Sequence, residues 1–125
     1  MAIKHKSDIL LNVKLDENKI PEEITWTAED GGVKDEETKA FFLSIWDPNR
    51  KETLKMDLWT KDMPLDEMKV FFHQTLLSMS DTFERATNDE KMTATMRDFC
   101  AYFAEKLELI DHTKKNEGFE FLKGE

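Results

Sequence analysis

The sequence predicts an α+β fold: a four-stranded antiparallel sheet, made of two hairpins, covered on one face by a C-terminal antiparallel helix pair. Apolar residues alternate with polar ones through the first half of the chain, and they recur every three or four positions through most of the second half. The two patterns meet at residues 57–64, where Pro64 suits the first turn of a helix. We therefore expect one domain over residues 1–110 and a polar tail over residues 111–125.

The first hairpin is predicted from strands at residues 7–15 and 22–28. Apolar side chains occupy the odd positions from 9 to 15, and a second alternation follows from Ile24 to Ala28. Residues 16–19 are turn formers, and Pro21 suits a strand entrance because it has no N–H for the ladder. Glu-Asp-Gly-Gly at 29–32 predicts a turn, and the acidic residues 34–39 a loop or one helical turn.

The second hairpin is predicted from strands at residues 40–46 and 51–60. They flank Asp-Pro-Asn-Arg at 47–50, a favourable turn sequence. A register with Trp46 facing Lys51 places Leu43 opposite Leu54 and makes one face uniformly apolar. That face is expected to be the core side of the hairpin.

The opposite face of this hairpin is the candidate interaction surface. It carries Phe42, Trp46 and Trp59 among polar side chains, which is unusually aromatic for a face in contact with water. A second copy of the chain or a protein partner would cover it. The alternative is coverage by the tail or by the N-terminal strand.

The helices are predicted at residues 64–86 and 88–110. Acidic residues after Pro64 complement the positive end of the first helix. Thr87 and Glu90 match a capping box that begins the second helix after a very short connection, so the helices should pack antiparallel. Each helix has one apolar stripe: Met68, Phe72, Leu76, Met79 and Phe83 on the first, and Met92, Met96, Phe99, Phe103, Leu107 and Ile110 on the second. The stripes are read as core, with an adaptable methionine-rich groove as the alternative.

Composition limits the partners and the compartment. A net charge of −9 repels phosphate backbones and anionic lipid surfaces, which argues against nucleic acid as a partner. The single cysteine, Cys100, cannot form an internal disulfide. With no signal-peptide pattern and no apolar run of membrane-spanning length, the expected location is the cytoplasm, without direct membrane insertion.

No pattern in the sequence predicts catalysis or a bound cofactor. His5, His73 and His112 lack any regular ligand spacing, and no calcium loop or phosphate-binding glycine motif is present. Cys100 is read as a small buried side chain, since no base can be placed beside it. We expect no catalytic residue, no cofactor and no metal. An enzyme or ligand carrier would instead need an apolar cavity with converging polar groups.

Several long strings resemble the GldC family of gliding motility proteins. They lie at residues 23–32, 57–64, 71–76, 81–87, 96–100 and 102–107, and the resemblance extends over residues 7–110. It implies a small soluble accessory protein of the gliding machinery of Bacteroidota, linked to type IX secretion, with no catalytic residues. The predicted role is a protein-interaction module whose partner is unknown, with self-association also possible.

The alternative is a chaperone or export-targeting factor that binds unfolded clients. The predicted order of four strands and two helices, with net negative charge, is similar to that of the export chaperone SecB. This is an analogy of fold.

Overall fold

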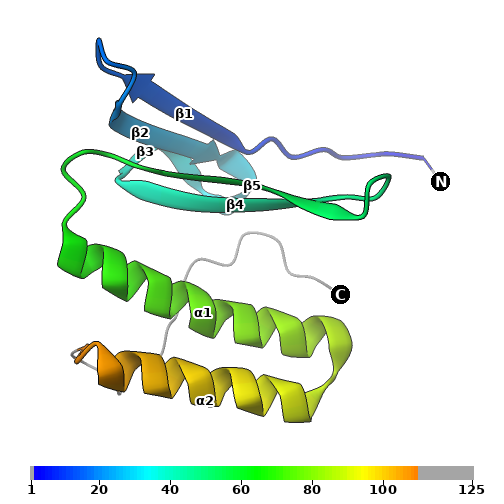
Figure 1. Ribbon diagram of the computed structural model, residues 1–125. Helices are drawn as coiled ribbons and strands as arrows, with labels where there is room; N and C mark the ends of the chain where they lie inside the picture. The colour runs from blue at the N-terminus through cyan, green and yellow to red at the C-terminus, as the bar shows by residue number, and fades with distance from the viewer. Residues whose placement is uncertain (1, 110–125) are drawn as a thin grey trace. The chain divides into compact units, whose positions relative to one another are not determined.

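The computed structural model describes residues 2–109, within which the chain forms five strands, one 3-10 turn and two α-helices (Figure 1). The strands belong to one compact unit that ends at Met63, and the helices to another that begins at Pro64. The fold is α+β, with a three-stranded and a two-stranded antiparallel sheet and a C-terminal helix pair. The single four-stranded sheet was wrong. That the helix pair covers a sheet face within one domain stays a prediction.

The three-stranded sheet contains β1 (Leu10–Leu15), β2 (Pro21–Ala28) and β3 (Val33–Thr38), in the order β1-β2-β3. The predicted first hairpin is confirmed, although its first strand begins at Leu10 rather than at residue 7. Ile24 in the central strand is fully buried and lies between Val13 of β1 and Thr38 of β3. The alternation in β2 therefore does mark the inward face of this sheet.

β3 is the strand that the sequence did not predict. Its residues Lys34–Glu37 are charged and exposed, and only Val33 is buried. Because β3 lies at the edge of its sheet, it is held by the backbone ladder with β2 rather than by an apolar face of its own. The turn before it is as expected: residues Glu29–Gly31 form the 3-10 turn, and Gly32 follows with φ of 78°, a conformation that glycine adopts without strain.

The second hairpin pairs β4 (Ala40–Asp47) with β5 (Glu52–Trp59). Its register differs by two residues from the predicted one, because Trp46 lies opposite Thr53 rather than Lys51. The loop has the expected four residues but lies one position later, at residues 48–51. There the Lys51 N–H donates to the Asp47 carbonyl at 2.8 Å, and Lys51 takes a positive φ of 56°. A shift of two residues keeps every side chain on its predicted face.

The helices are α1 (Leu65–Thr87) and α2 (Glu90–Lys106), which run antiparallel (Figure 1). The predicted capping box was wrong, because Asp89 is the N-cap of α2 and accepts a hydrogen bond from the Met92 N–H at 3.0 Å. Thr87 instead ends α1, and Asn88 closes that helix with a φ of 58°. The second helix begins at Glu90 and ends at Lys106, four residues before the predicted end at residue 110.

Small side chains form the seam between the two helices. The buried residues of this seam are Ser80 on α1 and Thr93, Cys100 and Ala104 on α2. Arg97 lies on the same side of α2, because positions 93, 97, 100 and 104 follow one another at intervals of four, three and four residues. Arg97 bridges to Asp81 at 2.7 Å and Glu84 at 3.1 Å on α1. Small residues let the two backbones approach closely, so this seam sets how the helices pack.

The predicted apolar stripes lie beside this seam rather than in it. At 100° per residue both stripes fall about a quarter-turn from the seam, and in an antiparallel pair they face the same side. Several of their members are roughly half exposed: Phe72, Met79, Met92 and Phe99.

None of the helices formed by residues 2–109 combines the length and the apolar content that crossing a bilayer requires. The tail predicted at residues 111–125 lies outside the described residues.

Candidate protein-interaction surface

The three predicted aromatic residues lie on one face of the β4–β5 hairpin. Phe42 and Trp46 occupy even positions of β4, and Trp59 pairs with Ala40, another even position. Since successive side chains of a strand point to opposite faces, all three share a face. Trp46 is 61% exposed and Trp59 52% exposed, whereas Phe42 is half-buried.

This aromatic face is not one continuous cluster. Trp59 is a diagonal neighbour of Phe42, whose direct partner is Asp57. Trp46 lies four residues further along β4, about 13 Å from Phe42 at the usual rise of a strand. The space between holds an ion pair in which Lys55 Nζ lies 2.7 Å from an Asp57 carboxylate oxygen. The face therefore offers two aromatic contact points separated by polar groups.

The opposite face of the hairpin is also exposed, which the sequence did not predict. Ile45, Leu54 and Met56, assigned to the core side, are each about half exposed. The alternation correctly predicted that these three side chains share a face of the hairpin. It did not show whether another part of the protein covers that face. Toward its loop the hairpin thus presents large apolar side chains on both faces.

The base of the hairpin is tied to the three-stranded sheet through Lys61. Its N–H donates to the Pro21 carbonyl at 3.2 Å, and its ammonium group lies 2.9 Å from both Asp16 and Glu22. The hydrogen bond from Lys61, with amide donors from Asn18 and Ile20, lowers the pKa of Asp16 to about 2. Reciprocally, the hydrogen bond to Asp16 raises the pKa of Lys61. This cluster holds the hairpin at the end remote from its loop.

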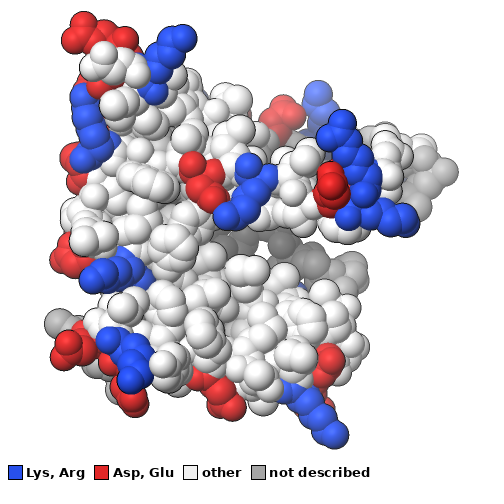
Figure 2. All heavy atoms as spheres, in the orientation of Figure 1, with Lys and Arg blue, Asp and Glu red and all other residues white. Residues whose placement is uncertain are grey.

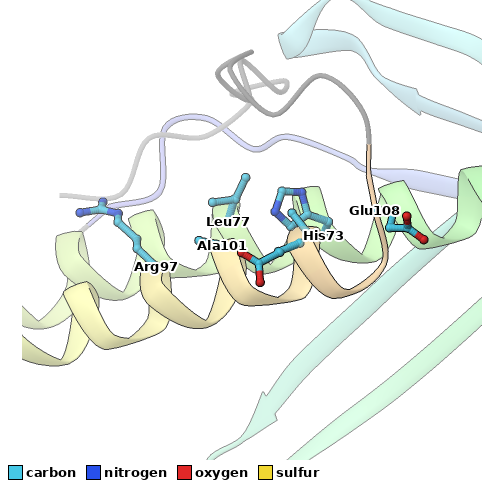
Figure 3. Close-up of a pocket in the computed structure, with 7 residues that line it drawn as sticks. His73, Leu77, Arg97, Ala101 and Glu108 are labelled. Atoms are coloured by element: carbon cyan, nitrogen blue, oxygen red, sulfur yellow. The ribbon is translucent and has the colours of Figure 1, made fainter.

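In the helical unit, a groove of about 520 Å³ opens between α1 and α2. Figure 3 shows His73 and Leu77 rising from α1 beside Arg97 and Ala101 of α2. His73 donates from Nε2 to the Cys100 carbonyl at 3.1 Å, and its ring stacks on Phe103 with centroids 6.1 Å apart. His73 is therefore part of the helix packing.

Cys100 lies in the seam beneath this groove. It is only 2% exposed, and burial raises the pKa of its thiol, which disfavours the reactive thiolate. Over residues 2–109, no three side chains of histidine, cysteine, aspartate or glutamate converge as a metal site would need. His112 lies outside the described residues.

Charge is dispersed over the view in Figure 2, where acidic and basic side chains stand among broad uncharged areas and neither sign forms one large patch. The β4–β5 hairpin exposes large apolar side chains, among them two tryptophans, and β1 and both helices expose others.

A comparison with protein families matches residues 21–109 to the family described as gliding motility-associated protein GldC-like. The match spans well over half of the 125 residues and includes β2 to β5 and both helices. The chain belongs to the GldC-like family. The resemblance found in the sequence is thereby confirmed, and with it an association with gliding motility. No curated protein and no solved structure matches the chain.

Proposed function

We propose that this GldC-like protein is a non-enzymatic, cytoplasmic accessory component of the gliding machinery, linked to type IX secretion, that binds a protein partner through the β4–β5 hairpin. The observation that carries the proposal is the exposure of Trp46 and Trp59 on one face of a two-stranded ribbon. Large aromatic side chains contribute strongly to binding free energy when a partner buries them.

The geometry of the aromatic face suggests how a partner would bind. Trp46 and Trp59 are six strand positions apart, which is about 20 Å. The Lys55–Asp57 ion pair lies between them and offers polar contacts at the centre of the footprint. A partner with two apolar pockets at this separation would bury both indoles.

Affinity capture tests this proposal. The full chain is immobilised and exposed to extract from gliding cells, as wild type, as Trp46→Ala/Trp59→Ala and as Tyr102→Ala. Tyr102 is the matched control, because it is an aromatic residue of similar exposure, 55%, on α2. We expect a gliding component to be retained by the wild type and by Tyr102→Ala and to be lost from the double variant.

Equal retention by the double variant would contradict the proposal, provided that its circular dichroism matches the wild type. A second assay separates a specific partner from general client binding. A protein that holds unfolded clients would suppress aggregation of an unrelated denatured protein at modest excess, and we expect this protein not to do so.

A further inference from the structure

The groove between α1 and α2 is the feature that carries a further inference. Opposite Leu77 of α1, the residues of α2 that line it include Ala101 and Ala104, whose small side chains leave space between the helices. Ala101 is exposed and Leu77 half-buried, so the groove presents apolar surface. Its volume of about 520 Å³ is in the range of sites that bind apolar groups.

The groove opens on the side of the helix pair away from the apolar stripes. Leu77 is two positions from Met79 of one stripe, and Ala101 is two positions from Phe99 of the other. Two positions correspond to about 200° around a helix. The groove and the stripes are therefore separate surfaces.

The end of α2 brings the chain to the mouth of this groove. The Glu108 N–H donates to the Glu105 carbonyl at 3.1 Å, and the Leu109 N–H donates to the Ala104 carbonyl at 3.0 Å. With the positive φ of Glu108, 53°, these are the two hydrogen bonds of a Schellman motif, which ends a helix by turning the chain back. Glu108 and Ala104 line the groove, and Figure 3 shows Glu108 at one end and Arg97 at the other.

The sequence that follows Leu109 contains one short apolar group. Residues 111–125 are otherwise polar or glycine, and the exceptions are Phe119, Phe121 and Leu122. Phe119 comes ten positions after Leu109, and ten extended residues reach about 33 Å. The groove covers eleven helical positions from Arg97 to Glu108, about 16 Å. The apolar group can therefore reach any point in the groove, with length left for a turn.

The spacing of the two phenylalanines matches the groove. Alternate side chains of an extended segment point to one side and are about 7 Å apart. His73 and Leu77, one helical turn apart on the wall of the groove, are separated by a rise of about 6 Å. An extended segment can therefore place both rings in the groove and leave Glu120 in solvent.

The mouth of the groove is acidic. Glu105 and Glu108 line it, and within residues 2–109 neither forms an ion pair, unlike Arg97 at the far end. Lys114 and Lys115 lie in the sequence between this mouth and the apolar group. Their ammonium groups can neutralise the two carboxylates, so charge also favours entry of this segment from the Glu108 end.

We propose that residues 118–122 of this chain, Gly-Phe-Glu-Phe-Leu, dock in the groove between α1 and α2. The segment is extended there, and its two phenylalanine rings pack against Leu77 and Ala101. Because segment and groove belong to one chain, the effective concentration is on the order of millimolar, and modest contacts suffice to fill the groove. The groove is thus a site for an extended peptide with aromatic residues at alternate positions, and the chain supplies that peptide itself.

The inference concerns the helical unit and does not depend on the proposed gliding partner, which would contact the β4–β5 hairpin. A protein with an empty groove that still captures a gliding component would overturn this inference and leave the proposed function standing. A filled groove in a protein that captures nothing would do the reverse.

NMR of the full chain is the direct test. We expect nuclear Overhauser cross-peaks between the two phenylalanine rings of residues 118–122 and the methyl groups of Leu77 and Ala101. Their relative intensity should not change on dilution, because the contact forms within one chain. Missing cross-peaks would overturn the proposal, and so would their loss on dilution, which would assign the segment to a second copy.

A pair of variants tests which side chains fill the groove. Phe119→Ser/Phe121→Ser should move the Ala101 methyl resonance, since the rings no longer lie against it. The matched control, Glu117→Ser/Glu120→Ser, changes the same segment and should leave that resonance in place. Both variants lie outside α1 and α2, so the helices are retained. An Ala101 resonance that is the same in the wild type and the phenylalanine variant would contradict docking.

A peptide of residues 115–125 tests whether the groove accepts the segment as a ligand. It should bind Phe119→Ser/Phe121→Ser and restore the Ala101 methyl resonance. If the chain's own segment fills the groove nine-tenths of the time, the wild type binds the peptide about ten-fold more weakly. A peptide with serine at both phenylalanine positions should bind neither chain. Equal binding of the unmodified peptide to both chains, or no binding to the variant, would overturn the proposal.

Discussion

At the scale of single residues, Lys61 shows how one side chain connects two sheets. It contacts Pro21 through its backbone and Asp16 and Glu22 through its ammonium group. No pattern in the sequence predicts this cluster, because Lys61 is distant along the chain from all three partners. One partner, Asp16, lies in the turn that residues 16–19 predicted correctly, so local prediction succeeded where the long-range contact could not be seen.

The first prediction concerns the ionisation of Asp16. Its folded-state pKa of about 2 lies below the ordinary 3.8, so it contributes stability that is full above about pH 4 and is lost as the pH falls toward 2. Lys61→Met removes the leading cause while keeping the apolar stem of the side chain. We expect the pKa of Asp16 to move part of the way back toward 3.8, since the amides of Asn18 and Ile20 still donate to it.

The measurement is a carboxyl NMR titration of the wild type and the variant. Lys39→Met is the control, because Lys39 pairs with Asp62 at 3.5 Å and makes no ion pair with Asp16 among the described contacts. An Asp16 pKa that stays near 2 in Lys61→Met would show that Lys61 is not the cause of the shift.

At the scale of elements, the helix seam depends on small side chains. Ala104 is 7% exposed and faces α1, so a larger side chain there would force the helices apart. We expect Ala104→Leu to lower the free energy of unfolding by roughly 1–3 kcal/mol, the usual cost of overpacking. Ala94→Leu adds the same atoms at an exposed position of α2 and should change stability little.

Urea denaturation followed by circular dichroism measures both variants. The midpoint should fall for Ala104→Leu with little change in slope. Equal midpoints for the two variants would mean that the seam is not closely packed at Ala104.

The elements also show what periodicity can and cannot predict. Long stripes predicted both helices to within a few residues, and alternation predicted four of the strands. β3 was missed because a charged edge strand has no apolar period to detect. The apolar stripes showed which side of each helix carries the large apolar residues. The contact between the helices instead uses Ser80, Thr93 and Cys100, whose small side chains do not stand out in an apolar pattern.

The candidate surface was predicted in part for a similar reason. The alternation of side chains along β4 and β5 correctly predicted that Phe42, Trp46 and Trp59 share a face, in spite of the shifted register. Their separation into two contact points follows from the register itself, which the loop conformation at Lys51 decides. The exposure of Ile45, Leu54 and Met56 depends on what lies over the hairpin, and a sequence pattern does not contain that information.

At the scale of the whole molecule, the chain combines a strand unit and a helical unit, and both present apolar side chains to their surroundings. Membership in the GldC-like family connects this organisation to gliding motility. The proposed function makes the β4–β5 hairpin the part of the molecule on which that process depends, through Trp46 and Trp59.

The measurement that tests this function most directly is the speed of gliding in cells that lack the protein and are complemented with wild type, Trp46→Ala/Trp59→Ala or Tyr102→Ala, each at equal abundance. We expect the wild type and Tyr102→Ala to restore gliding and the double variant to fail. Gliding at wild-type speed with the double variant would contradict the proposed role of the hairpin.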